Sequence, residues 1–459
     1  MNVENQKNLK PGEARCPGPS TKDIILADGW DVPEALVTES YEFISDQDLS
    51  FDRYISEDFF QAEMDRMWTK TWQWACREEH IPEAGDFYVY DIGEYSILIA
   101  RTDDGAIKAY HNACLHRGTQ LKASDTSGNV PQFRCPFHGW TWNLDGSLAE
   151  IPCEWDFPHV KAEEFNLPEV RVETWGGFVF INMDENAKPL SEYLEVLPEH
   201  FRDGWDLNKR KIVLHVQKEL PANWKAAQEA FLEAYHVVET HAQALPTAGD
   251  ANAQYDVFGE NVTRFVHTIG YQSPHYQGKD QTQQEILDKL GAAPEGAKVP
   301  EGSTARAVAA EHLRKTLGEE WGLDLSGYSD SEMLDSIEYH LFPNMFLFPG
   351  VSLPMIYRFR PLGNDVDRSV FDLLFLQPVA DESERDIPPE PVRIGVDDSY
   401  TTVPDMNQGL GFVYDQDTSN LDMQTKGFRA SKKRGETLGN YQEVRIRNIH
   451  RTLDRYLNA

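Results

Sequence analysis

The sequence lacks two features that would direct a protein into or across a membrane. None of its 459 residues belongs to an apolar run of 18 or more, the length that a membrane-spanning helix requires. The first residues, MNVENQKNLKPGEARCPGPSTKD, contain no apolar segment of the kind found in secretory signals. We therefore expect a cytoplasmic protein with no membrane contact.

Positive charge is also scarce. The chain has 43 lysine and arginine residues against 76 aspartate and glutamate residues, which gives a formal net charge of −33. Proteins that bind nucleic acid neutralise phosphates with clustered basic side chains. The composition therefore argues against a nucleic-acid partner.

Cysteines are few, and a dinucleotide-binding motif is missing. The five cysteines are an odd set in a protein expected to be reduced, so metal ligation is a better default than disulfides. No G-x-G-x-x-G segment lies between an expected strand and an expected helix. We therefore expect no dinucleotide-binding site of this type in the chain.

What the chain does have is enough apolar material for more than one core. Its residues are 40% hydrophobic, and one core stops growing at about 250–300 residues, so we expect two domains in an α+β protein. Residues 1–45 are polar and are expected to form an N-terminal arm. Residues 46–185 are expected to form a small all-β domain with a preceding helix. Residues 186–459 are expected to form a larger α+β domain, with an antiparallel sheet flanked by helices and a helical insertion at 272–335.

Periodicity places the main elements. Apolar residues recur at helical spacing between Ser56 and Trp72, and they alternate with polar ones in the strand-rich region from about 85 to 185. Asn223 is a suitable cap for a helix that runs to His241. Further helices are expected at 282–291, 303–319 and 440–457.

Two short loops carry the strongest chemical signal. Cys114-Leu-His116 and Cys135-Pro-Phe-His138 each supply one thiol and one imidazole. Two thiolates can hold one iron of a [2Fe–2S] unit while two imidazoles hold the other iron. A tetrahedral zinc site is the alternative, but zinc fingers usually pair Cys with Cys and His with His. The remaining cysteines have no partner at ligand spacing and are interpreted as inert: Cys16, Cys76 and Cys153.

A second set of possible ligands lies on the helix that follows Asn223. Glu233 and His236 share one helical face, but His241 would lie some 140° from His236 on an ideal helix. Both histidines can bind one ion only if the helix ends or bulges between them, and the run 237–240 is where we expect this. Two histidines and one carboxylate form the facial triad of non-haem Fe(II) sites.

Both segments resemble the Rieske non-haem iron oxygenases, and the resemblance is to the large (alpha) subunit of aromatic-ring-hydroxylating members. NACLHRG and FRCPFHGWTWNLDG are similar to the family's cluster loops, and NWK…H…H is similar to its iron-binding motif. The resemblance implies a [2Fe–2S] Rieske cluster on Cys114, His116, Cys135 and His138. By the same resemblance the residues next to the cluster ligands are Arg117, Gly139 and Trp140.

The resemblance also implies a mononuclear Fe(II) held by His236, His241 and a distant carboxylate. In VYDQDTSNLDMQTKG it indicates Asp417, with Asp415 as the alternative. The family usually has Asp where this chain has Glu233, so the reach of this side chain is in question while its charge is kept. The implied role of Glu233 is to carry electrons between His236 and a cluster histidine, His138 of the partner subunit.

The implied function is that of a terminal oxygenase component. It would use O₂, and electrons from NAD(P)H delivered by a separate reductase or ferredoxin, to add one or two oxygen atoms to a bulky, mainly apolar and aromatic substrate. Oxidative demethylation of a small methylated substrate is one alternative, and a Rieske electron carrier without oxygenase activity is another. A zinc-stabilised binding protein is the third. The resemblance implies a homotrimer and leaves a small beta subunit open.

Two further regions are candidates for contacts. The expected wall of the substrate pocket consists of the apolar residues Phe231, Leu341, Phe342, Met345, Phe346 and Phe348. The densest basic run, Lys426 to Glu436, is a candidate docking surface for an acidic electron donor.

Overall fold

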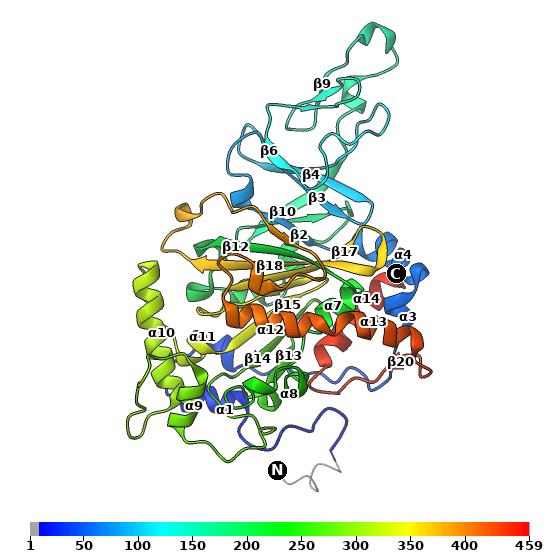
Figure 1. Cartoon of the computed structure of the whole chain (residues 1–459). Coiled ribbons are helices and arrows are strands. Elements are labelled where there is room, and N and C mark those ends of the chain that lie inside the picture. Colours follow the sequence, from blue (N-terminus) through cyan, green and yellow to red (C-terminus); the bar gives the residue numbers. More distant parts are fainter. Residues whose placement is uncertain (1–8, 459) are drawn as a thin grey trace.

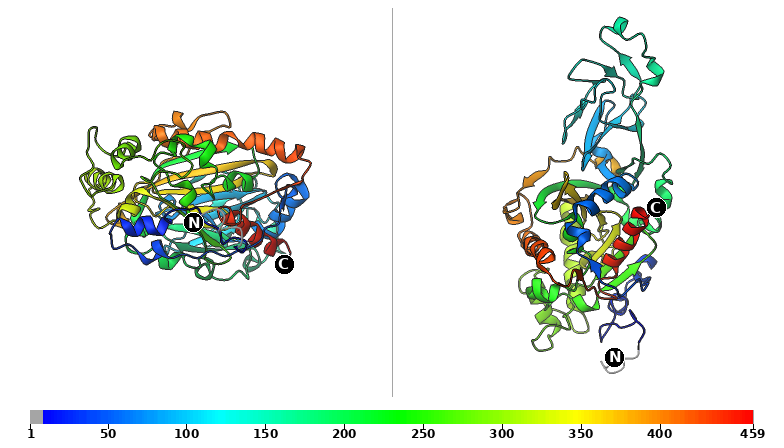
Figure 2. Two further views of the ribbon diagram at one scale, coloured as in Figure 1. Left: turned by 90° about the horizontal axis from the view of Figure 1, so that it is seen from below. Right: turned by 90° about the vertical axis from the view of Figure 1, so that its right-hand side faces the viewer.

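The computed structural model describes residues 9–458 and has two parts (Figure 1). A small β domain projects from one end of a larger body, and helix α8 (Val237–Thr240) lies toward the opposite end of that body. The side view in Figure 2 shows the same elongated shape. Residues 1–8 of the expected arm lie outside the described residues.

The small domain contains a seven-stranded sheet in the order β2-β11-β10-β5-β4-β3-β6 and a three-stranded sheet in the order β7-β8-β9. The pairings of these strands are antiparallel, and a hairpin turn that contains Asp104–Gly105 joins β4 to β5. The strands are β2 (Gln73–Arg77), β3 (Asp86–Ile92), β4 (Tyr95–Arg101), β5 (Ile107–His111), β6 (Ser127–Asn129), β7 (Phe133–Arg134), β8 (Thr141–Trp142), β9 (Leu148–Glu150), β10 (Glu169–Trp175) and β11 (Phe178–Asn182).

The large domain is built on an eight-stranded sheet in the order β13-β14-β15-β16-β17-β18-β12-β19. The expected antiparallel sheet is confirmed except at one edge, where β19 runs parallel to β12. Its strands are β12 (Arg210–Leu220), β13 (Gln254–Val257), β14 (Val262–His267), β15 (Ser336–Leu341), β16 (Met345–Leu347), β17 (Met355–Leu362), β18 (Asp365–Pro378) and β19 (Val392–Ile394). A small separate pair, β1 (Leu49–Ser50) with β20 (Gly435–Glu436), joins distant parts of the chain.

Helices cover the large sheet on both faces (Figure 2). The helix expected from Ser56 begins as α4 and continues as a π-helical turn at Met64–Trp68, and Ser56 caps it. The helices are α1 (Thr21–Ala27), α2 (Glu34–Val37), α3 (Asp52–Ile55), α4 (Glu57–Glu63), α5 (Leu190–Tyr193), α6 (Leu197–His200), α7 (Trp224–Glu229), α8 (Val237–Thr240), α9 (Gln283–Leu290), α10 (Ala305–Trp321), α11 (Asp330–Leu334), α12 (Gln408–Ser419), α13 (Leu421–Ala430) and α14 (Val444–Leu457).

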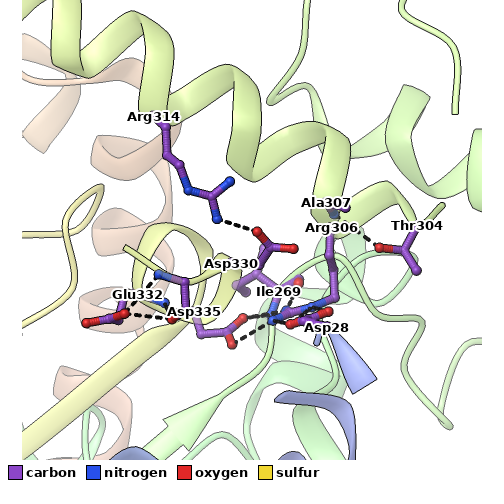
Figure 3. A network of polar contacts seen from close by, with 10 residues as sticks. Asp28, Ile269, Thr304, Arg306, Ala307, Arg314, Asp330, Glu332 and Asp335 are labelled. Atoms are coloured by element: carbon purple, nitrogen blue, oxygen red, sulfur yellow. Dashed lines mark hydrogen bonds and ion pairs between the residues drawn. The ribbon is translucent and has the colours of Figure 1, made fainter. Parts of the chain in front are cut away.

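The insertion is fastened to the body by a buried polar network (Figure 3). Arg306 at the start of α10 forms ion pairs of 2.7 Å with Asp28, which follows α1, and with Asp335, which precedes β15. Arg314 lies about two turns further along α10 and pairs with Asp330 of α11. Because truncating one partner of a buried ion pair leaves an uncompensated charge, this network holds the arm, the insertion and the sheet in one arrangement.

Within the described residues, none of the helices is long and apolar enough to cross a membrane.

Candidate metal centres

The two Cys–His loops have the same backbone design. In each, a glycine four residues after the cysteine donates its N–H to the cysteine carbonyl, at 2.9 Å for Gly118 and 3.1 Å for Gly139. Both glycines have a φ near +80°, a conformation that costs other residues about 1–2 kcal/mol. The turns bring Cys114 and Cys135 together in the domain core, where each is 3% exposed.

The two imidazoles of these loops lie close to each other. The rings of His116 and His138 are 4.7 Å apart between centroids, and Nδ1 of His116 is buried without a hydrogen-bond partner. Burial raises the pKa of the Cys114 thiol, and the neighbouring Cys135 thiol adds to the rise while the backbone N–H of His116 opposes it. A buried ring nitrogen without a partner and two adjacent thiols are ligands available to a metal centre.

The spacing of these four ligands fits two metal ions better than one. A tetrahedral zinc ion with bonds of about 2.0–2.3 Å would hold all four donor atoms within about 4 Å of each other. Among the described residues, no three of these donor atoms lie within 4.8 Å of one another. The thiol pair and the imidazole pair therefore match the two irons of a [2Fe–2S] unit.

The residues beside the cluster ligands take defined places. The ring of Trp140 stacks on His116 at 5.2 Å between centroids and an angle of 4°, and the guanidinium of Arg117 lies 5.3 Å from the ring of Phe137. Trp140 is buried, so it fixes the orientation of His116. Phe137 is 58% exposed beside His138, so this end of the β domain presents an apolar side chain to its surroundings.

The chain path around the second centre differs from the expected long helix. Asn223 caps α7 as expected, because its side chain accepts the N–H of Lys225 at 3.1 Å. The helix then ends at Glu229 and residues 230–236 are irregular, while 237–240 form one helical turn. The interruption is therefore real, but the prediction that it falls at 237–240 was wrong. The backbone leaves the helical conformation at His241, which has a φ of −121° and a ψ of 42°, and the rings of His236 and His241 lie 5.2 Å apart between centroids.

Three side chains converge at this centre. Nε2 of His241 lies 2.6 Å from Oδ1 of Asp417, and Nε2 of His236 lies 3.5 Å from the same oxygen. One donor atom from each residue falls within 4.8 Å of the others. Helix α12 supplies Asp417. Because Asp417 lies 176 positions after His241 in the sequence, residue spacing alone could not indicate it.

The alternative carboxylate, Asp415, is engaged elsewhere. It accepts the backbone N–H of Tyr400 at 2.9 Å and a hydrogen bond from the Ser399 hydroxyl. Two residues along a helix differ by about 200° in direction, so Asp415 and Asp417 cannot face the same histidines.

Glu233 reaches His236 in spite of its extra methylene. One carboxylate oxygen lies 2.8 Å from Nδ1 of His236, and the other accepts the backbone N–H of His236 at 2.9 Å. Nε2 of His236 is therefore the nitrogen left for an ion. Glu233 fixes the ring and would make it a stronger ligand.

A residue that the sequence interpretation missed orients the second histidine. Oε1 of Gln416 lies 3.0 Å from Nδ1 of His241, and its amide donates to the carbonyl of Thr240 at 2.7 Å. The Gln-Asp pair in the resemblance was the available signal, but a glutamine is not a ligand type and carried no expectation of its own.

The electrostatics of this centre favour a bound cation. Burial acts to lower the pKa of His236, but the charge of Glu233 and the hydrogen bonds with Asp417 and Glu233 outweigh it and raise the pKa to about 10. Burial acts to raise the pKa of Asp417, and hydrogen bonds with His236 and His241 bring it below its usual range. The carboxylates thus draw positive charge into the centre, which a divalent ion can supply in place of protons.

None of the six residues expected to form the pocket wall lines the cavity beside His236 and Asp417. Phe231, Phe342, Phe346 and Phe348 belong to the core that lies against α7 and α14. Leu341 and Met345 lie on the opposite face of the sheet, in a different core. Side chains alternate along β15 and β16, so a contiguous run of apolar residues could not all face one site.

A cavity of about 470 Å³ opens beside His236 and Asp417. Four glutamates line it, together with a few apolar side chains, and none of the described residues that line it is lysine or arginine. The glutamates are Glu229, Glu233, Glu436 and Glu443.

The basic run from Lys426 to Glu436 is less positive than its sequence indicates. Four of its cations lie in ion pairs with acidic residues, so their charge is largely compensated at the surface. These pairs are Lys426–Asp422, Arg429–Asp367, Lys433–Asp48 and Arg434–Asp52.

Comparisons with known proteins agree with both centres. Residues 71–162 match the family model of the Rieske [2Fe-2S] domain, and residues 207–459 match that of the ring hydroxylating alpha subunit catalytic domain. These matches assign a [2Fe–2S] cluster to the small domain and a mononuclear iron to the large one.

Two curated relatives illustrate the range of similar proteins. A 198-residue segment is 32% identical to the glycine betaine monooxygenase oxygenase subunit of Pseudomonas aeruginosa, covering 42% of this chain and 44% of the relative. A 193-residue segment is 34% identical to the alpha subunit of benzene 1,2-dioxygenase of Pseudomonas putida, covering 41% of this chain and 42% of the relative. The matched segments thus span less than half of each relative.

Solved structures share the fold over most of its length. A naphthalene 1,2-dioxygenase structure superposes with a TM-score of 0.62 at 20% identity, covering 91% of this chain and 94% of the other. A quaternary ammonium Rieske monooxygenase superposes with a TM-score of 0.61 at 17% identity, covering 89% and 95%.

Proposed function

Because the chain belongs to the ring hydroxylating alpha subunit family and carries a Rieske domain, we propose that it is the terminal oxygenase component of a multi-protein system. The convergence of His236, His241 and Asp417 within 4.8 Å is the observation that supports this most strongly. It supplies the donor set of an Fe(II) site with open positions, which a simple electron carrier would not need.

We assign roles to the residues on this basis. Cys114, Cys135, His116 and His138 would hold the [2Fe–2S] cluster, and His236, His241 and Asp417 would hold the mononuclear iron. When bound, the iron supplies the positions at which O₂ is activated with electrons from the cluster. Glu233 keeps Nε2 of His236 directed at the iron position through the contact of 2.8 Å at Nδ1.

The shape of the chain supports electron transfer between subunits. The strands β7 to β9, which adjoin the cluster loops, lie at one end of the molecule, and α8 lies at the other (Figures 1 and 2). Phe137 and Trp155 are 58% and 80% exposed in the small domain, so a neighbouring subunit has apolar side chains to cover. We therefore propose a homotrimer in which each cluster serves the iron of the next subunit through Glu233.

The proposed substrate is bulky and mainly apolar, with an aromatic ring. Aromatic side chains lie next to the iron ligands: Phe231 contacts Tyr414 of α12 at 6.3 Å between ring centroids, and the charge of Asp417 contributes to raising the pKa of Tyr414, after burial as the main cause. Aromatic side chains around a binding site favour a substrate with an apolar ring. The relative that acts on benzene supports the same class of substrate.

Oxidative demethylation of a small methylated cation is the second candidate. The four glutamates in the cavity beside His236 favour a positively charged substrate, and the glycine betaine relative supports this reading. Both candidates use the same iron chemistry, so the substrate alone distinguishes them.

Electrons would come from NAD(P)H through a separate reductase or ferredoxin. The compensated ion pairs of 426–436 make that run a poor docking surface for an acidic partner. We place the system in the cytoplasm, where the five unpaired cysteines would stay reduced. The proposed domain limits are 46–185 and 186–459, with the insertion at 272–335.

The test is substrate-dependent O₂ uptake by the purified, chemically reduced holoenzyme. Aromatic hydrocarbons and aromatic acids form one panel, and glycine betaine and related methylated amines form the other. Uptake with product formation in the aromatic panel is expected, and uptake only with methylated amines would move the assignment to demethylation. If the cluster can be reduced but neither panel causes substrate-dependent O₂ uptake, the protein would be an electron carrier and the proposed oxygenase function would be overturned.

Subunit exchange tests the trimer. Chains with Cys135→Ser lack a cluster ligand, and chains with His236→Ala lack an iron ligand, so neither assembly alone should be active. Co-expressed mixed assemblies should recover activity if a cluster serves the neighbouring iron. Inactive mixed assemblies that retain both metal centres would contradict electron transfer between subunits.

A further inference from the structure

A buried polar cluster lies beside the iron cavity, and the assigned ligands do not use it. The hydroxyl of Tyr54 on α3 lies 2.9 Å from Oε2 of Glu229 and 2.9 Å from Nε2 of His450, and it also hydrogen bonds to Oε1 of Glu436. Tyr54 and His450 are 1% exposed and Glu229 is 5% exposed. The chain thus brings four titratable groups from α3, α7, α14 and β20 into direct contact.

The hydrogen atoms of this cluster can be counted. Nδ1 of His450 lies 3.4 Å from the guanidinium of Arg53, which is always a donor, so Nδ1 accepts and Nε2 carries the hydrogen of the neutral ring. That hydrogen points to Oε1 of Glu229 at 2.8 Å. Tyr54 has a single hydrogen but contacts both carboxyl groups, so one of these contacts requires a proton on a carboxyl group.

The surrounding charges do not remove the need for this proton. Lys225 pairs with Glu63 at 2.6 Å and Arg53 pairs with Asp454 at 2.7 Å. Among the described residues, neither Glu229 nor Glu436 forms an ion pair with a lysine or arginine. The charged groups that act on the cluster are Arg53, Lys225, Glu443, Arg447 and Asp454, and Glu63 stands behind Lys225 as its ion-pair partner.

The pKa values of the two glutamates also favour a carboxyl group that holds a proton. Burial raises the pKa of Glu229 to about 8, and burial together with the charges of Glu229 and Glu443 raises the pKa of Glu436 to about 8. A carboxyl group with a raised pKa keeps its proton through neutral pH and loses it above pH 8. Burial also lowers the pKa of His450 well below its ordinary value, so the ring stays neutral.

The cluster borders the space where O₂ and water would meet the iron. Glu229 and Glu436 line the same cavity of about 470 Å³ as His236 and Asp417. Glu436 is only partly buried, so it is the member that can exchange protons with solvent. The Tyr54 hydroxyl fills the space between the two carboxyl groups and His450, which favours a shared proton over a metal ion there.

We propose that Tyr54, Glu229, Glu436 and His450 form a proton-holding cluster that supplies protons to the iron cavity. The inference rests on the proposed function, because inserting one oxygen atom of O₂ into a substrate takes up two electrons and two protons and releases one water. The electrons come from the Rieske cluster, which the external donor reduces. A proton leaves Glu229 for cavity water. Tyr54 then passes its hydroxyl proton to Glu229 and takes one from Glu436, and bulk water reprotonates Glu436.

Infrared spectroscopy tests the stored proton without turnover. The holoenzyme titrated from about pH 6 to about pH 10 should lose a band of a protonated carboxyl group, with a midpoint near pH 8. Glu229→Gln should remove or displace the band, and Tyr54→Phe should shift its frequency while keeping both carboxyl groups. The control Glu239→Gln removes an exposed carboxylate on α8 and should leave the band unchanged. A wild-type protein without such a band would overturn the proposal.

Turnover tests the delivery of the proton. Glu229→Gln should slow product formation by about 100-fold and release more O₂-derived peroxide per product, at unchanged iron content and unchanged cluster spectrum. Tyr54→Phe should show a smaller loss, and Glu239→Gln none. A Glu229→Gln enzyme with the full coupled rate would contradict proton delivery. If wild type takes up no O₂ with any substrate, the oxygenase assignment fails, and with it the role in turnover, while the infrared titration still decides whether the proton is stored.

Discussion

The two metal centres of this chain are built in opposite ways. All four proposed cluster ligands lie between positions 114 and 138, on two loops with the same glycine-closed turn. The iron centre joins His241 to Asp417 across 176 positions of the chain, through a broken helix and a separate helix, α12. A local centre depends on the conformation of its own loops, whereas a distributed centre depends on the packing of the whole domain.

The largest effects should come from removing ligands of the distributed centre. Asp417→Asn should abolish mononuclear iron binding and product formation, because two histidines without the carboxylate leave an incomplete triad. Asp415→Asn is the matched control, since Asp415 bonds to Ser399 and Tyr400 instead. Metal analysis of both variants decides the third ligand, and retention of iron only in Asp417→Asn would reverse the assignment.

Removing a ligand of the local centre should eliminate the cluster and leave the iron centre in place. Cys135→Ser should eliminate the visible absorption and the EPR signal of the cluster, because a thiolate that holds iron is lost. The mononuclear iron should remain, since its ligands come from the other domain. Metal analysis alongside the visible spectrum measures both, and loss of both centres together would show that they do not form independently.

An intermediate effect is expected from the residue that orients His241. Gln416→Ala removes the partner of Nδ1 at 3.0 Å and should weaken iron binding by about 10–100-fold without changing the cluster. The measurement is an iron titration of the apoprotein followed by substrate-dependent O₂ uptake. Affinity equal to that of wild type would show that the helical turn alone fixes the ring.

The smallest effect should come from the cluster loops' backbone. A Cβ at Gly118 would meet no atom within 4 Å, so Gly118→Ala isolates the cost of a positive φ, about 1 kcal/mol. The same change at Gly139 would also press on Arg134, an exposed side chain that can move. Thermal bleaching of the cluster should begin at a slightly lower temperature in both variants than in wild type. A higher bleaching temperature in the variants would exclude a cost from the positive φ.

The same contrast explains what could be predicted from the sequence. The cluster loops could be identified because their ligands are close together and of distinctive types. Helices with clear caps were also predictable: α9 and α10 lie where they were expected, each capped by a threonine. In these cases the signal and the structure are both local.

Features that depend on tertiary packing were not predictable. The break at residues 230–236 lies among good helix formers. Helix propensity therefore does not predict that α7 ends at Glu229. Leu341 and Met345 were assigned to the wrong face because strand register decides which residues meet. Asp417 came from the resemblance to the family and not from spacing, since its partners lie far away in sequence.

The most direct test of the electron path is a single turnover. The wild-type holoenzyme, reduced chemically and then mixed with O₂ and a substrate, should reoxidise its cluster and form hydroxylated product, while His236→Ala should keep its cluster signal and form none. Equal reoxidation without product in both proteins would contradict a path from the cluster to an iron held by His236, His241 and Asp417.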